Sequence, residues 1–179
     1  MTRDAGAGKS FGWRRAGVSC MLPAMRFSRQ VQYALCGIFD LAYNGAGEPV
    51  HVRRVGERQG IPYRFLEQIF QRLRRAGLVV GKRGPGGGFV LTRPPSQISL
   101  REVVEAVDGP IAGDPPPHLE RNGGAGEGAA SVHRPDFLWD DLAARMAGVL
   151  GEIQVADVCR EAVRRSVVRD LSSRFDYEI

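Results

Sequence analysis

One segment, residues 61–93, most constrains what this chain can fold into. It reads IPYRFLEQIFQRLRRAGLVVGKRGPGGGFVLTR, a helical pattern followed at once by two short β-prone stretches. Apolar residues recur every three or four positions in the first half, which predicts a helix over about 62–76, with Pro62 in its first turn and Gly77 at its end. The side chains predicted to be buried are Phe65, Leu66, Ile69, Phe70 and Leu73.

A shorter helix is predicted just before this one. The stretch VRRVGERQG ends at Gly60, and glycine readily adopts the left-handed conformation that ends helices. A brief strand is expected before it at PVHV, and a longer helix from Gln30 onward. Two helices with a tight turn at QGIP between them fit a helix-turn-helix, whose second helix can enter a DNA major groove.

The two β-prone stretches, LVVGKR and GFVLTR, are joined by GPGG. Glycine accepts a positive φ without penalty, so this junction is typical of a hairpin turn. A hairpin directly after a helix-turn-helix is a wing, here residues 82–92. The predicted fold is therefore mainly α with a small β-hairpin wing.

The rest of the chain divides by composition. Residues 1–24 lack the apolar core of a secretory signal and are expected to be a disordered extension, followed by a winged domain over 25–108. Ser99 and Glu102 have the spacing of a capping box for one more helix. Proline and glycine predict a flexible loop over 109–135. For residues 136–179, apolar periodicity predicts a long dimerisation helix and a second helix that reaches to about Leu171.

Positive charge is concentrated in the same segment that predicts the winged fold. Seven cations fall within 61–93 against the lone acid Glu67: Arg64, Arg72, Arg74, Arg75, Lys82, Arg83 and Arg93. On the predicted helix the outward-facing residues are Arg64, Glu67, Gln68, Gln71, Arg72 and Arg75. Arginine pairs with guanine, glutamine with adenine, and a carboxylate accepts from cytosine, while the remaining arginines suit phosphates.

Four motifs together resemble one family of bacterial winged-helix regulators, the Rrf family that includes IscR, NsrR and CymR. They are MRFSRQVQYAL, ERQGIPYRFLEQIFQRLRRAGLV, RGPGGGFVL and LREVVEAVDG. The resemblance implies a cytoplasmic, homodimeric transcription regulator, expected to be a repressor, on a palindromic operator of double-stranded DNA. It implies base reading by Arg64, Glu67 and Gln68 and a wing contact by Arg83. The expected DNA-binding set adds Gln71, Arg72, Arg75, Gly86 and Gly87.

Many members of that family hold an iron–sulfur cluster through cysteines in the loop before the dimerisation helix. The corresponding loop here, 109–138, contains no cysteine, and the chain has three in all, at positions 20, 36 and 159. Thiolates are the usual cluster ligands, so no cofactor is expected. His118, His133 and Asp136 are alternative ligands for a divalent metal, although loop histidines are more often simply solvated. Cys159 is a candidate redox-sensing thiol.

Other functional classes fit the sequence less well. The stretch GAGKS resembles the end of a phosphate-binding loop, but Arg3 stands where that motif requires glycine, so an enzyme is not expected. No apolar run approaches the ~20 residues of a membrane span, and three scattered cysteines favour a reducing cytoplasm. The alternatives left open are a metal- or thiol-gated regulator of the same fold and a winged-helix adaptor that binds protein.

Overall fold

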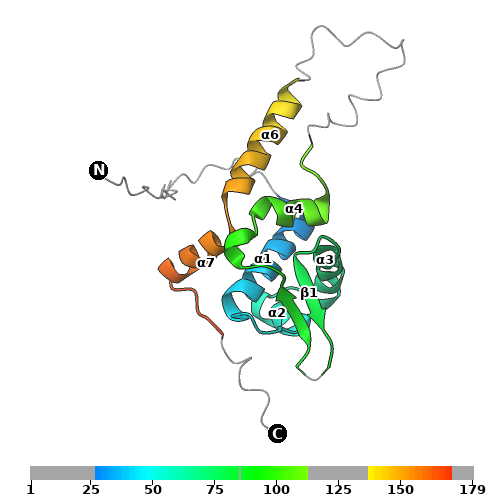
Figure 1. Ribbon diagram of the computed structural model, residues 1–179, viewed down its shortest axis with the longest axis vertical. Helices are drawn as coiled ribbons and strands as arrows, with labels where there is room; N and C mark the ends of the chain where they lie inside the picture. The colour runs from blue at the N-terminus through cyan, green and yellow to red at the C-terminus, as the bar shows by residue number, and fades with distance from the viewer. Residues whose placement is uncertain (1–26, 85, 113–136, 171–179) are drawn as a thin grey trace, which may run out of the picture.

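The computed structural model describes residues 27–84, 86–112 and 137–170 (Figure 1). The predicted extension at 1–24 and most of the predicted loop at 109–135 lie outside these stretches. Their elements, in chain order, are α1 (Arg29–Asn44), α2 (Val52–Gln59), α3 (Tyr63–Arg75), β1 (Val79–Lys82), β2 (Gly88–Leu91), η1 (Pro95–Gln97), α4 (Leu100–Asp108), α6 (Phe137–Glu152) and α7 (Val155–Arg164). These elements confirm the prediction of a mainly α fold with a small β-hairpin.

Helix α1 lies at the centre and packs against α3, α4 and α7. Ser28 caps its start by accepting from the Val31 amide at 3.2 Å. Its buried stripe faces the side chains of α3, and Gly37 lets the two helices approach closely. A Cβ at Gly37 would lie 2.9 Å from the Phe70 ring, so only glycine fits there without a shift.

Helices α2 and α3 form the predicted helix-turn-helix. The turn depends on Gly60, which has φ 65° and whose amide donates to the carbonyl of Gly56. The Ile61 amide also donates to that carbonyl, at 2.9 Å, and a Cβ at Gly56 would lie 2.7 Å from the Ile61 oxygen. The absence of a side chain at position 56 therefore lets the chain turn sharply into α3.

Strands β1 and β2 form the predicted hairpin, antiparallel from the Val79–Leu91 pair to the Lys82–Gly88 pair. The hairpin is joined to the start of α2 by reciprocal backbone hydrogen bonds between Val50 and Phe89, each 2.9 Å long. This single bridge replaces the brief strand expected at PVHV. The Phe89 ring lies 5.0 Å from that of Phe70, so the hairpin also packs against α3.

The capping box expected for α4 is present, with the Ser99 side chain accepting from the Glu102 amide and Glu102 accepting from the Ser99 amide. Helix α6 follows the second gap and stands away from the compact body (Figure 1). Its end is fixed by the Leu100 amide, which donates to the Ile153 carbonyl at 2.9 Å. No helix in the described stretches is long and apolar enough to cross a membrane.

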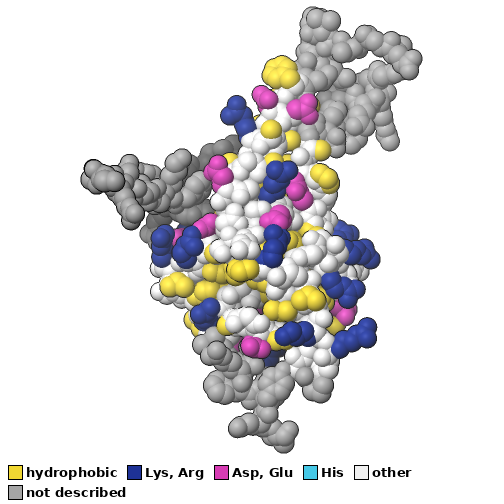
Figure 2. Space-filling model, in the orientation of Figure 1, with side chains coloured by type: hydrophobic (Ala, Val, Ile, Leu, Met, Phe, Trp, Pro, Cys, Tyr) yellow, Lys and Arg dark blue, Asp and Glu magenta, His cyan; other side chains and the backbone are white. Residues whose placement is uncertain are grey.

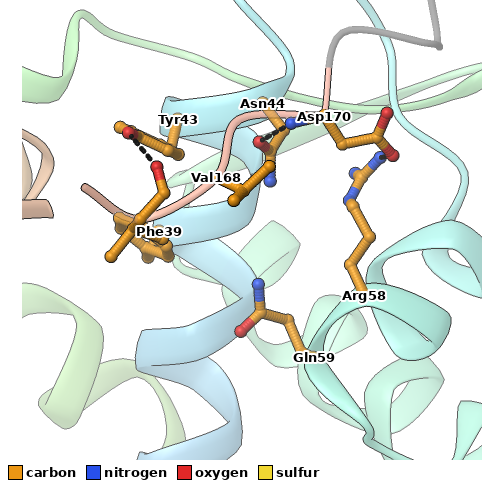
Figure 3. Close-up of a pocket in the computed structure, with 8 residues that line it drawn as sticks. Phe39, Tyr43, Asn44, Arg58, Gln59, Val168 and Asp170 are labelled. Atoms are coloured by element: carbon orange, nitrogen blue, oxygen red, sulfur yellow. Dashed lines mark hydrogen bonds and ion pairs between the residues drawn. The ribbon is translucent and has the colours of Figure 1, made fainter. Parts of the chain in front are cut away.

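The prediction that the last helix continues to about Leu171 is wrong, because α7 ends at Arg164 and Ser166 has a positive φ of 56°. The chain instead runs back over α1 (Figure 3). There the Tyr43 hydroxyl donates to the Val167 carbonyl at 2.9 Å, and the Asp170 amide donates to Asn44 Oδ1 at 3.0 Å. These side-chain partners replace the hydrogen bonds that a continued helix would have made.

A buried ion pair lies beneath this returning segment. The Asp40 carboxylate is fully buried and pairs with the guanidinium of Arg58 at 2.5 Å. Asn44 and Gln59 also donate to it, at 3.1 and 2.9 Å. Arg58 reaches Asp170 at 3.2 Å as well, so the first helix, the helix-turn-helix and the returning segment are held together here (Figure 3).

Candidate nucleic-acid interface

Helix α3 has one buried and one exposed face. Leu66, Ile69, Phe70 and Leu73 are buried, as predicted. The side chains predicted to face outward are all exposed: Arg64, Glu67, Gln68, Gln71, Arg72 and Arg75. Figure 2 shows Lys and Arg side chains gathered on the side of the molecule that carries α3 and the hairpin. The helix thus presents a polar, mainly cationic surface beside the wing.

Phe65 was expected in the buried stripe, and the structure shows it 41% exposed. It lies at the margin of the stripe near the start of α3, and its ring centroid is 6.2 Å from that of Tyr33 of α1. The guanidinium of Arg64 lies 4.9 Å from the centroid of the Phe65 ring. Phe65 therefore supports Arg64 by a cation–π contact at the surface.

The first turn of α3 contains a side-chain contact that was not predicted from the sequence. The Tyr63 hydroxyl donates to Oε1 of Glu67 at 2.6 Å. This hydrogen bond raises the pKa of Tyr63, because it stabilises the protonated phenol. The spacing of four residues, which brings side chains together on a helix, was the available signal.

Arg72 is occupied by contacts within the chain. Its Nη1 donates to Gln30 Oε1 at 2.5 Å and to the Val107 carbonyl at 2.6 Å. The second acceptor lies in the last turn of α4, where carbonyl oxygens lack partners within their own helix. Arg72 thus ties α3 to α1 and α4, and its predicted contact with DNA stays a prediction.

Arg93, counted among the cations of the segment, is also occupied. Its Nη2 lies 2.7 Å from Oε1 of Glu102, and its Nη1 donates to the Gln97 carbonyl at 3.1 Å. Along α3 and the hairpin, some exposed cations make no side-chain hydrogen bond or ion pair among the described residues. They are Arg64, Arg74, Arg75, Lys82 and Arg83.

The tip of the hairpin requires glycine. Gly84 and Gly86 have φ of 101° and 74°, and the Gly87 amide donates to the Gly84 carbonyl at 2.8 Å. A Cβ at Gly87 would lie 2.5 Å from the Lys82 oxygen, a distance that real Cβ atoms do not adopt. The exposed side chains of Lys82 and Arg83 lie at the start of this turn. At the tip Gly84 is exposed beside these two cations, whereas Gly86 is half-buried and Gly87 is buried, so the predicted DNA contacts of Gly86 and Gly87 stay predictions.

The structure describes the redox candidate but not the metal candidates. His118, His133 and Asp136 lie outside the described residues. Within those residues, no group of three or more His, Cys, Asp or Glu side chains could hold a metal ion. Cys159 is half-buried, and burial raises the pKa of its thiol although Arg169 and Arg160 act in the opposite direction. A raised pKa lowers the fraction of reactive thiolate, so this environment does not favour redox sensing.

Comparison with known proteins identifies the family to which the chain belongs. The Rrf2 family model, described as an iron-dependent transcriptional regulator, matches residues 27–161. The chain belongs to the Rrf2 family. Like other Rrf2 proteins it is a transcriptional regulator and not an enzyme.

Individual Rrf2 proteins resemble the chain in sequence and in structure. The HTH-type transcriptional regulator IscR of Cronobacter sakazakii is 37% identical over 150 residues, which cover 84% of this chain and 87% of that protein. Among solved structures, T. potens IscR has a TM-score of 0.60 at 27% identity, covering 82% of this chain and 95% of its own. CymR, the global cysteine regulator of B. subtilis, has a TM-score of 0.59 at 28% identity, covering 76% and 98%.

Proposed function

We propose that this Rrf2 protein is a homodimeric, sequence-specific DNA-binding repressor that reads a palindromic operator. Residues 62–76 would lie in the major groove and the wing, 82–92, at the minor groove. The observation that carries the proposal is the exposed face of α3, the second helix of a helix-turn-helix, beside a basic hairpin fixed to the same body.

The exposed side chains divide into two chemical groups. Arg64, Glu67 and Gln68, in the first half of α3, carry the donors and acceptors that distinguish base edges. Gln71, Arg75 and Arg83 suit phosphates, and the small turn around Gly86 and Gly87 lets the backbone approach DNA closely. Phosphate contacts supply affinity that falls with salt, whereas base contacts supply the preference for one sequence.

The dimer is proposed from the exposed apolar face of α6. Phe137, Leu138, Leu142 and Val149 are 69%, 39%, 43% and 50% exposed. Leu138, Leu142 and Val149 are spaced by four and seven residues and so share one face of a helix that stands away from the body (Figure 1). A second copy related by a twofold axis would cover this face and present two recognition helices to a palindrome.

We also propose that DNA binding does not depend on a conventional iron–sulfur cluster. The family description mentions iron, but the donor set of this chain does not fit a cysteine-held cluster. No cysteine occurs in 109–138, and Cys36 and Cys159 lie half-buried on α1 and α7. Anaerobically purified protein is expected to lack cluster absorbance, and a brown preparation with stoichiometric iron and sulfide would contradict this.

The proposed function is tested by selection from randomised duplexes with the full chain. We expect enrichment of a palindrome that is bound with steep salt dependence. Glu67→Ala should change the enriched base at one position of each half-site more than the overall affinity. The proposal fails if no sequence is enriched, or if binding is unaffected between low and moderate salt. A partner protein captured in place of DNA would instead favour the adaptor alternative.

A further inference from the structure

The contact between Tyr63 and Glu67 lies on the exposed face of α3, outside the buried core. Tyr63 is 48% exposed and is not among the buried core side chains. Its neighbour Phe65, and not Tyr63, makes the ring contact with α1. The Tyr63 hydroxyl instead reaches one turn along the exposed face and donates to Oε1 of Glu67 at 2.6 Å. A bond of this length is typical of a hydroxyl donating to a charged carboxylate.

A carboxylate that reads a base edge has two oxygens to satisfy. Cytosine N4 offers a hydrogen bond to one of them, and water is displaced from around both when the helix enters the groove. An oxygen that loses its water without a replacement carries a desolvation penalty. In this chain the Tyr63 hydroxyl already bonds Oε1, so Oε2 is the oxygen left to accept from the base.

The same hydrogen bond restricts the rotamers of Glu67. A glutamate side chain at an exposed helical position has considerable conformational freedom, which it loses on binding. With Oε1 held by Tyr63, the carboxylate is fixed on the surface of the first turn before DNA arrives. Pre-organisation of this kind favours the ligand geometry that it matches over other geometries.

Resting on the proposed function, we infer that Tyr63 is a positioning and specificity-determining residue, which holds the Glu67 carboxylate so that it accepts from a cytosine in the major groove. Tyr63 acts through Glu67, so its contribution is confined to the base pair that Glu67 reads.

The test compares Tyr63→Phe with the unaltered full chain in randomised-site selection, followed by titration of the selected duplex and of duplexes changed at each position. Phenylalanine keeps the ring and removes only the hydroxyl. We expect discrimination at the Glu67-read position to fall about threefold to tenfold, the scale of one hydrogen bond. Preferences at all other positions should stay the same.

Two further variants show whether the effect passes through Glu67. Tyr33→Phe removes a hydroxyl from the α1 ring that contacts Phe65 and should leave every preference unchanged. In a Glu67→Ala background, Tyr63→Phe should have no additional effect at that position, because the acceptor is already gone.

The outcomes separate this inference from the proposed function. If the unaltered chain selects an operator but Tyr63→Phe keeps the full preference, the role of Tyr63 is overturned and the proposed function stands. The role is also overturned if the loss spreads over all positions or persists in the Glu67→Ala background. If the unaltered chain enriches no sequence, the proposed function fails first.

Discussion

At the scale of residues, neighbouring arginines on α3 have different environments despite identical chemistry. Both Arg72 and Arg75 are exposed, but Arg72 donates to Gln30 and the Val107 carbonyl, whereas Arg75 makes no side-chain hydrogen bond or ion pair among the described residues. A helical wheel places both on the outer face and cannot distinguish them. The difference comes from the start of α1 and the end of α4, which lie within reach of position 72.

A matched pair of substitutions checks this distinction. Arg72→Met should lower the free energy of unfolding by about 1 to 3 kcal/mol, because it removes two hydrogen bonds made by a charged group. Arg75→Met should leave stability within about 0.5 kcal/mol and reduce the salt slope of DNA binding by about 1. Urea unfolding and salt titration measure the two effects. A stability loss for Arg75→Met equal to that for Arg72→Met would contradict the assignment.

A second residue-scale prediction concerns the capping box of α4. Burial raises the pKa of Glu102, but hydrogen bonds from Arg93 and Ser99 outweigh it and hold this pKa below its ordinary value of 4.5. A carboxylate with a depressed folded pKa stabilises the fold above its ordinary value, and the stabilisation is lost as pH falls through the folded pKa. Glu102→Gln should therefore be less stable than the unaltered chain at neutral pH, with the difference vanishing in acid. Thermal unfolding of both proteins, measured from neutral pH down to acid, checks this prediction. A stability difference that does not change with pH would contradict it.

At the scale of elements, local patterns predicted most of the fold. Apolar periodicity predicted α1, α3 and α6, Gly60 predicted the end of α2, and the glycines predicted the hairpin. Each of these signals acts within a few residues. The wrong end of the last helix depended on distant contacts of Tyr43 and Asn44, and the Asp40–Arg58 pair, which was not predicted, depends on packing between two helices. At the site, the exposed face was predictable, but the partners of Arg72 and Arg93 were not.

The hairpin turn allows a prediction with an internal control. Gly87→Ala should destabilise the wing, because its Cβ would lie 2.5 Å from the Lys82 oxygen, whereas Gly81→Ala would meet Phe89 at an ordinary 3.7 Å. We expect a loss of about 1 to 3 kcal/mol for the first and less than about 1 kcal/mol for the second. Thermal unfolding and DNA titration measure both consequences. Equal behaviour of the two variants would show that the turn tolerates a side chain.

For the whole molecule, the proposed function requires two copies of the chain in a symmetric arrangement. One compact body carries the recognition surface, and α6 stands away from it with an exposed apolar face (Figures 1 and 2). Under the proposed function a single winged domain would contact only one half-site, so selective binding to a long operator would require the proposed pairing through α6.

Substitution on the exposed face of α6 tests this pairing. Leu142→Glu places a charge in the proposed dimer contact and should convert dimers to monomers while leaving the fold intact, since Leu142 is 43% exposed. Ala144→Glu, about 200° around the helix from Leu142, should remain dimeric. Sedimentation velocity measures the state of each. A dimeric Leu142→Glu protein would show that another surface forms the contact.

Methylation protection on the selected duplex tests the proposal that two copies of α3 read one palindrome from the major groove. Guanine N7 lies in the major groove and adenine N3 in the minor groove. We predict two stretches of N7 protection with centres about one helical turn apart, and N3 protection where the wings lie. A single protected stretch, or protection confined to the minor groove, would contradict the account.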